Sequence, residues 1–329
     1  NNAKDILDAG LGSDYGITAL YTGMLRRLGY DATVFHAPSR EDGLFIKQWE
    51  NPSQLTLCGT AVAGPGDEIR WLFPSYEGST ARALPWMAQD ETAILERPGN
   101  QEIAARFSLT GLLPMAEARD NRVDMVTTLL MEPGGDLSGR LRATWLCESD
   151  PDLRREVIRR QGQGAADYLK ARLGGIVPSL RTWDESAGVE STGVVYACSL
   201  RAGGLVQAAG TRNLVSLGSF RSDDYSLPDR RREFQVHFRY PRITRSRVAL
   251  TLPDGYALVA AAADSLSTDF LRFRCTGADS GETVIRDREF DLLYNIFMPE
   301  GADSLRRLFQ AVQEIDGKPL VLAPAKGGP

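Results

Sequence analysis

Beyond residue 122, short apolar runs separated by turn-forming residues recur, and this pattern restricts that part of the chain to a fold rich in antiparallel strands. The runs Met125–Met131 and Leu137–Cys147 flank a Pro-Gly-Gly-Asp sequence, the composition of a hairpin turn. Between Phe234 and Tyr240, apolar and polar residues alternate strictly, as in a half-buried strand. We therefore predict a mainly β domain over residues 122–323. It also contains two predicted helices, over 151–173 and 305–315.

The first hundred residues combine one amphipathic helix with short strands. Ser13 or Asp14 is suited to cap the helix, and Gly29 is suited to end it. Between them, apolar residues recur at helical spacing and form one apolar face: Ile17, Leu20, Tyr21, Met24, Leu25 and Leu28. Apolar runs at 32–36, 55–62 and 69–73 predict strands. We predict one helix packed on a small antiparallel sheet, in a domain spanning residues 1–110.

The composition is typical of a globular protein and excludes several functional classes. Of the 329 residues, 43% are hydrophobic and 25% are charged, which argues against a disordered or fibrous chain. A net charge of −5 argues against nucleic acid as a partner, because phosphate requires a basic surface. Apolar runs are too short to predict a membrane-spanning segment. With two histidines, His36 and His237, and four widely spaced cysteines, we expect no metal site and no cofactor.

Three local patterns resemble ligand sites, but each has a simpler explanation. The glycine-rich segment Gly10–Gly16 lacks the preceding strand that a phosphate-binding loop requires. Asp223, Asp224 and Asp229 lack the spacing of a calcium loop. The arginines between positions 230 and 247 mostly alternate with apolar residues, which indicates a solvated strand face. We therefore predict no nucleotide, calcium or anion site from these patterns.

Motifs in the N-terminal third resemble those of bacterial cell-envelope proteins with a transglutaminase-like domain. Gly12-Ser13-Asp14-Tyr15-Gly16 stands where that family has Gly-Asp-Cys-Lys-Asp, and Leu55-Thr56-Leu57 stands where it has Phe-Asn-His. Trp71-Leu72-Phe73-Pro74-Ser75 is similar to its Tyr-Leu-Asp-Pro-Thr strand, and 248–256 is similar to a segment of its later β-rich domain. The resemblance covers residues 5–98 and 125–323. It implies an α+β fold with a papain- or transglutaminase-like N-terminal domain.

Active members of that family use a cysteine–histidine–aspartate triad, in which a helix N-terminus favours the thiolate and the histidine takes its proton. The resemblance places Asp14, Leu57 and Phe73 at these three positions. None of the three side chains can perform the corresponding step. The resemblance therefore implies a pseudoenzyme with a degenerate site, whose groove around these residues binds a protein, a peptide or an envelope component. The alternative is that Leu57 and Phe73 fill the core and that Asp14 caps the helix.

Two other functions remain open from the sequence. A thiol hydrolase or acyltransferase with a rearranged nucleophile requires Ser13 or Cys58 within hydrogen-bonding reach of His36. A carbohydrate-binding β-sandwich requires exposed aromatic platforms. The candidate platforms are Trp71, Trp145 and Trp183.

The chain departs from the family pattern at its beginning. Transglutaminase-like domains carry helices before the helix of the nucleophile, and few residues precede that helix here. We therefore expect that the chain is a fragment of a longer protein, or that a second chain or an upstream domain covers the first helix. The resemblance also implies a periplasmic or cell-surface location.

Overall fold

The computed structural model describes the chain except residues 1–2, 44, 47, 49–50, 67, 82–83, 98, 100, 102–106, 174–179, 191–192, 219, 222–226, 228–232, 262 and 326–329. The aspartates at 223, 224 and 229 and the arginines at 230–232 lie outside the described residues. The chain forms two compact units. Unit 1 comprises residues 1–116 and 148–155, and unit 2 comprises residues 117–147 and 156–329.

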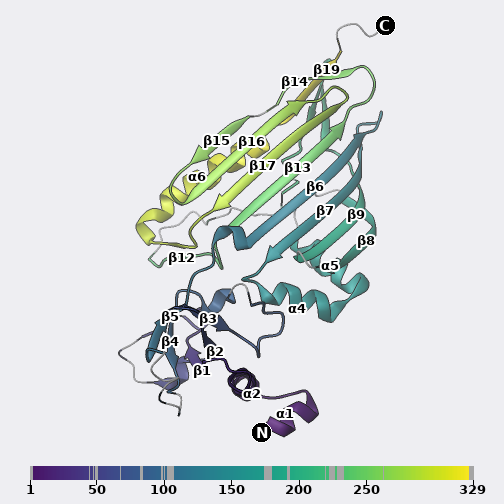
Figure 1. Ribbon diagram of the computed structural model, residues 1–329. Helices are drawn as coiled ribbons and strands as arrows, with labels where there is room; N and C mark the ends of the chain where they lie inside the picture. The colour runs from purple at the N-terminus through teal and green to yellow at the C-terminus, as the bar shows by residue number, and fades with distance from the viewer. Residues whose placement is uncertain are drawn as a thin grey trace. The chain divides into compact units, whose positions relative to one another are not determined.

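The protein is mostly β-sheet, and the predicted α+β class with a papain-like N-terminal domain is wrong. The described residues contain nineteen strands in four sheets but only five α-helices. The physical reason is the share of the chain in extended conformation: strands of up to eleven residues build large sheets, whereas a papain-like domain requires a substantial helical layer. Among the described residues, that layer is missing from unit 1 (Figure 1).

Unit 1 contains a five-stranded antiparallel sheet in the order β3-β2-β1-β4-β5. Its strands are β1 (Ala32–Ala37), β2 (Leu57–Ala63), β3 (Ile69–Leu72), β4 (Thr92–Leu95) and β5 (Thr110–Leu112). The helices α1 (Ala3–Ala9) and α2 (Asp14–Arg27) precede the sheet in sequence, and α2 lies against β1 and β2. Short 3-10 turns lie at Pro52–Gln54 and Trp86–Ala88.

Unit 2 contains an eight-stranded sheet in the order β15-β16-β17-β13-β6-β7-β9-β8. Neighbouring strands are antiparallel except β13 and β6, which are parallel. The bounds are β6 (Asn121–Met131), β7 (Leu137–Cys147), β8 (Leu180–Glu190), β9 (Gly193–Ala202), β13 (Arg242–Thr251), β15 (Asp264–Ser267), β16 (Leu271–Asp279) and β17 (Thr283–Leu292). The β6–β7 hairpin confirms the turn predicted between these runs.

Helix α6 (Ala302–Gly317) runs along the sheet near β15–β17, in yellow in Figure 1. Its residues Leu305, Phe309 and Val312 share a buried cluster with Phe273 and Phe290 of the sheet. Burial of this apolar face explains why the predicted helix over 305–315 forms. A four-stranded sheet follows the order β10-β11-β19-β14, with β10 (Val206–Ala209), β11 (Arg212–Val215), β14 (Tyr256–Ala260) and β19 (Leu320–Pro324).

Two predicted elements differ from those observed. The helix expected over 151–173 is two helices, α4 (Pro151–Arg160) and α5 (Gly162–Arg172), because Gln161 has a φ of 50°, which interrupts the helical backbone. The strand expected over 234–240 is only β12 (Val236–His237), which pairs with the two-residue β18 (Ile296–Phe297). Because β18 is only two residues long, it can form backbone hydrogen bonds with only two residues of the expected strand. No helix in the described part of the chain is long and apolar enough to cross a membrane.

Candidate functional site

Ser13 and Asp14 form the N-terminus of α2. Ser13 is the N-cap: its backbone is extended, and its side-chain oxygen accepts a hydrogen bond of 3.1 Å from the amide of Gly16. Asp14 is the first helical residue, where a carboxylate is favoured by the helix dipole. Asp14 therefore stands at a helix N-terminus, as the resemblance implies, but its position is explained by helix stability alone.

Leu57 and Phe73 pack in the core of unit 1. Phe73 is 5% exposed, and its ring lies edge-on to Phe35 at 5.3 Å. Leu57 is partly buried and packs against the same cluster, which also includes Leu95 and Leu113. These side chains pack together in an apolar cluster on the sheet, away from water. Packing in the core of unit 1 therefore accounts for the positions of Leu57 and Phe73.

Cys58 and His36 face each other across β1 and β2, but each side chain has another partner. They are directly opposed in the antiparallel register. The Sγ of Cys58 lies 3.6 Å from the Oγ1 of Thr18, and the Nε2 of His36 lies 3.0 Å from an Oε1 of Glu96. No hydrogen bond joins His36 to Cys58 or Ser13 among the described contacts. Glu96 was not predicted, because sixty residues separate it from His36.

The electrostatic environment keeps the Cys58 thiol protonated. Burial raises the pKa of Cys58, and the carboxylates of Asp14 and Glu96 raise it further, against the opposing effect of the Thr18 hydrogen bond. The negative charge of Glu96 is also the main cause that raises the pKa of Tyr15, whose ring stacks on His36 with centroids 5.9 Å apart. Because the thiolate is the nucleophile, this arrangement disfavours thiol catalysis at neutral pH.

We expect Cys58 to react slowly with iodoacetamide in the folded protein. Its labelling rate should stay low at pH 6–8 and rise only above the ordinary thiol pKa of about 8.5, because the native fold disfavours the thiolate. Peptide mass spectrometry resolves Cys58 from Cys198 and Cys275, which are also free and buried. Rapid labelling of Cys58 near pH 6 would contradict a raised pKa of this thiol.

Helix α2 buries two threonines against the sheet, whereas Met24 and the C-cap residue Leu28 are exposed. Thr18 and Thr22 are buried, and the Oγ1 of Thr22 lies 2.8 Å from the Oγ1 of Thr60 on β2. The hydroxyl of Thr22 also donates to the carbonyl of Thr18 at 2.8 Å. On the outer side, Met24 is 52% exposed and Leu28 is 73% exposed. Buried polar and exposed apolar side chains on one helix indicate a surface for contact.

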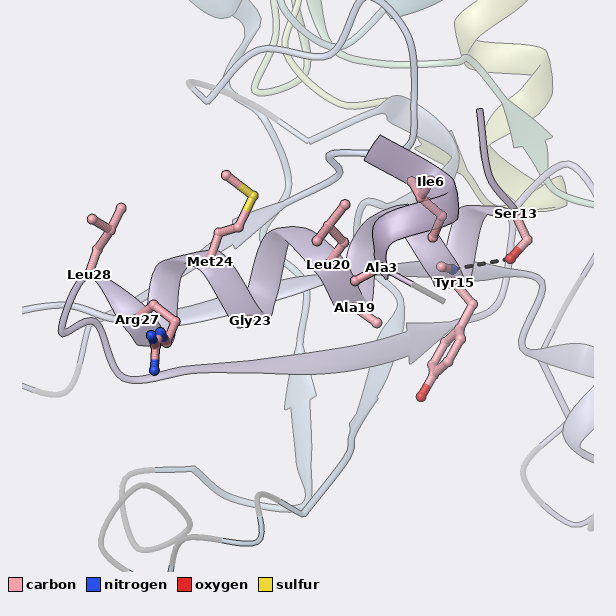
Figure 2. Close-up of a pocket in the computed structure, with 11 residues that line it drawn as sticks. Ala3, Ile6, Ser13, Tyr15, Ala19, Leu20, Gly23, Met24, Arg27 and Leu28 are labelled. Carbon is pink, nitrogen blue, oxygen red and sulfur yellow. Dashed lines mark hydrogen bonds between the residues drawn. The ribbon is translucent and has the colours of Figure 1, made fainter. Parts of the chain in front are cut away.

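An open groove of about 1110 Å³ lies between helix α1 and the outer side of α2 (Figure 2). We call it the α1–α2 groove. Ile6 of α1 packs over the first turns of α2, where residues with small side chains allow close approach to the helix backbone. Arg27 lines the C-terminal end of the groove. The lining residues are Ala3, Ile6, Ser13, Tyr15, Gly16, Ala19, Leu20, Gly23, Met24, Arg27 and Leu28.

The sequence contained a signal for this groove that periodicity did not reveal. Thr18 and Thr22 stand four residues apart, on the side of the helix next to the apolar face from Ile17 to Leu28. Gly16 and Gly23 are seven residues apart and therefore lie close together on the helix circumference. Small residues at that spacing indicate a surface where another element approaches closely.

The other candidate residues are dispersed. Trp71 lies edge-on to Phe35 at 5.0 Å in the unit 1 core, and Trp145 is buried in unit 2. Of the three candidate tryptophans, only Trp183, which is 46% exposed, offers an accessible ring. Within the described residues, no group of three histidine, cysteine or acidic side chains is placed to hold a metal ion. The α1–α2 groove is therefore the strongest candidate site.

Comparisons with known proteins match the C-terminal part of the chain to a domain family and the fold to a solved structure. Residues 214–322 match the family model of a domain of unknown function, DUF3858, for which a structure has been solved. The fold is similar to the crystal structure of a protein from Parabacteroides distasonis ATCC 8503 described as a "putative protease". The TM-score is 0.51, the identity is 10%, and the match covers 98% of this chain and 46% of that chain. This chain thus spans less than half of that protein's length. No curated protein matches the sequence.

Proposed function

We propose that this chain is a non-catalytic relative of the transglutaminase-like cell-envelope proteins and that it functions by binding a protein, peptide or envelope component at the α1–α2 groove. The observation that carries the proposal is the packing of α2, which buries Thr18 and Thr22 and exposes Met24 and Leu28. A helix that served only the fold would gain stability by burying its apolar side chains instead. The exposed stripe is explained if a partner covers it.

The side chains at the three catalytic positions support binding without catalysis. Asp14 begins a helix, and Phe73 fills a core, so neither is available for acyl transfer. Cys58, the cysteine considered as an alternative nucleophile, has a raised pKa. Its Sγ contacts Thr18 and not a base. On the basis of the family resemblance, we also propose a periplasmic or cell-surface location for the chain.

The proposal is tested with the apolar probe 1-anilinonaphthalene-8-sulfonate. We expect the wild-type protein to enhance its fluorescence and the Met24→Lys variant to lose at least half of the enhancement, because lysine places a charge in the apolar groove. Val259→Lys is the matched control, because Val259 on β14 is also 52% exposed. Lysine is a good helix former, so Met24→Lys should keep the fold, which circular dichroism checks.

The control separates groove binding from general surface binding of the probe. Equal losses in Met24→Lys and Val259→Lys, or no enhancement by the wild-type protein, would contradict a binding role for the α1–α2 groove. A selective loss in Met24→Lys supports it.

A further inference from the structure

We propose that the eight-stranded sheet of unit 2 carries a glycan-binding site beside a bulge in β8. In this site a pyranose stacks on Trp183, its hydroxyls hydrogen-bond to Asp184, and a carboxylate on the sugar pairs with Arg140. The site lies wholly in unit 2, so the inference is independent of the binding proposed at the α1–α2 groove. Three observations carry it: the strained backbone of the bulge, the side chains beside it, and the charge of Arg140.

Strand β8 contains a β-bulge near its centre. The register with β9 shifts between Trp183 and Ser186, so that Asp184 and Glu185 stand opposite one residue of β9, Cys198. Asp184 has a φ of 51°, in the left-handed region that glycine adopts more readily than aspartate. Strained backbone persists only where the surrounding structure holds it in place, and it clusters at functional sites.

The inner side of the bulge holds the backbone in this conformation. The Oε1 of Glu185 accepts hydrogen bonds from the Nζ of Lys170 on α5 at 2.9 Å and from the Oγ1 of Thr182 at 2.5 Å. The side chain of Glu185 is only 8% exposed, so water competes little for these bonds. Side chains alternate between the two faces of a strand, so Trp183, which follows Thr182, projects from the face opposite α5. The buried carboxylate of Glu185 therefore fixes the backbone that presents Trp183 and Asp184.

On that outer face, Trp183 stands in a row of side chains from adjacent strands. Trp183 pairs with Ser199 on β9, and Ser199 pairs with Arg140 on β7. Residues paired directly across antiparallel strands project to the same face. The hydroxyl of Ser199 donates to the Oδ2 of Asp184 at 3.4 Å. Asp184, Ser199 and Arg140 all line a depression of about 350 Å³ on this face.

Trp183 provides an aromatic platform at the side of this depression. It is 46% exposed, whereas Trp145 of the same unit is buried. An indole that remains half in water on a fixed strand forgoes the stabilisation that burial would give. One face of a pyranose carries C–H groups with partially positive hydrogens, which pack favourably on the negative face of an indole ring. The ionised oxygens of Asp184 are then available as acceptors for the hydroxyls of the sugar.

Arg140 determines the charge of the sugar. Arg142, two residues further along β7, pairs with Glu190 at 3.1 Å. Within the described part of the chain, by contrast, the exposed side chain of Arg140 forms no hydrogen bond or ion pair. Only Ser199 separates Arg140 from Trp183 in the row, a distance of about 10 Å between strands. The long arginine side chain can therefore reach a carboxylate on a sugar stacked on the indole, and a guanidinium binds a carboxylate through two parallel hydrogen bonds.

The bulge also argues against an added polypeptide strand at this place. Strand β8 is the last strand of the sheet, so its outer edge is the other surface at which a polypeptide could bind. The bulge interrupts the regular series of backbone donors and acceptors along that edge, which disfavours strand addition. The accessible groups beside it are an aromatic ring, a hydroxyl, a carboxylate and a guanidinium, and this set matches the C–H face, the hydroxyls and the acid group of a sugar.

The test uses isothermal titration calorimetry and tryptophan fluorescence with the α-1,4-linked trimer of galacturonic acid. The neutral trimer of galactose and the acidic peptide triglutamate are the comparison ligands. We expect the galacturonate trimer to bind at least about tenfold more tightly than the neutral trimer, because only the acid pairs with Arg140. We expect no binding of triglutamate, because it has no C–H face to stack on Trp183.

Variants of the two contact residues separate stacking from charge. Trp183→Ala should weaken binding of the galacturonate trimer at least about tenfold and abolish the fluorescence change, whereas Tyr294→Ala, at a residue of unit 2 that is 55% exposed, should do neither. Arg140→Gln should remove the preference for the acidic trimer. Arg274→Gln, at an exposed position of β16 near the far edge of the sheet, should retain that preference.

Asp184→Gly distinguishes a binding role of the bulge from a purely structural one. Glycine adopts a φ of 51° without strain, so the melting temperature should stay the same or rise. The affinity for the galacturonate trimer should nevertheless fall at least about fivefold, because the acceptor oxygens are lost. A variant as stable as the wild type that binds the trimer equally well would show that Asp184 has no part in binding.

The remaining outcomes decide the ligand. No binding of the galacturonate trimer, or equal affinity of Trp183→Ala and the wild type, would overturn the glycan site. Equal affinity for the acidic and neutral trimers would overturn the carboxylated sugar. Tighter binding of triglutamate, lost in Trp183→Ala, would replace the sugar by an acidic peptide. None of these results bears on the response of the anilinonaphthalene probe to Met24→Lys, because the α1–α2 groove belongs to unit 1.

Discussion

Replacing Phe73 by aspartate, the residue at the corresponding position of the transglutaminase-like proteins that this chain resembles, is expected to lower the free energy of unfolding of unit 1 by at least about 4 kcal/mol. Removal of a buried phenylalanine ring costs about 3–5 kcal/mol, and an unpaired buried carboxylate adds to that cost. Phe73 is 5% exposed and lies edge-on to Phe35, which is also buried. Introducing an aspartate at this position would therefore damage the core without completing a triad.

Chemical denaturation combined with amide hydrogen exchange of peptides from β1–β3 measures this effect in unit 1. Phe73→Leu is the matched control and should cost only about 1 kcal/mol, because it keeps an apolar side chain in the cluster. Leu57→His, at a partly buried position, should cost less than Phe73→Asp. If Phe73→Asp were as stable as Phe73→Leu, the position would be solvated and the site would be open to reconstruction.

Replacing Asp316 by alanine is expected to destabilise unit 2 by about 3–5 kcal/mol, because it would leave buried guanidinium groups uncompensated. Asp316, near the end of α6, is buried together with Arg286 and Arg288 of β17. The Nε of Arg288 donates to both carboxylate oxygens at 2.9 and 3.0 Å, and Arg221 donates at 3.2 Å. Arg286 also donates to the main-chain carbonyl of Asp316 at 3.2 Å.

Thermal or denaturant unfolding measures the effect, with an exposed ion pair on the same strand as the control. Glu289 of β17 pairs with Arg245 at 2.7 Å, but both side chains are partly solvated. Glu289→Ala should therefore cost no more than about 1 kcal/mol. The double variant Asp316→Leu/Arg288→Met should recover part of the stability lost in Asp316→Ala, because it removes one buried charge of each sign. Equal costs for Asp316→Ala and Glu289→Ala would show that the buried network does not stabilise unit 2.

The sequence by itself determined the local elements whose signals lie within a few residues. Ser13 caps α2 through the amide of Gly16, and α2 ends at Arg27, shortly before the predicted stop at Gly29. The β6–β7 hairpin forms around its Pro-Gly-Gly-Asp turn. These features depend on backbone propensity and on hydrogen bonds between near neighbours. The α+β class was wrong because it followed from resemblance and not from the length of chain in strands.

Only the tertiary structure decided which side of α2 faces the sheet and how Phe73 is packed. The sequence predicts one apolar face from Ile17 to Leu28, but the hydroxyl pair of Thr22 and Thr60 occupies the inner side of the helix. Phe73 became a core residue because Phe35, far away in sequence, lies beside it. Such contacts depend on strand order and register, which are set by packing between distant segments. Periodicity can therefore predict an apolar face but not the surface against which it packs.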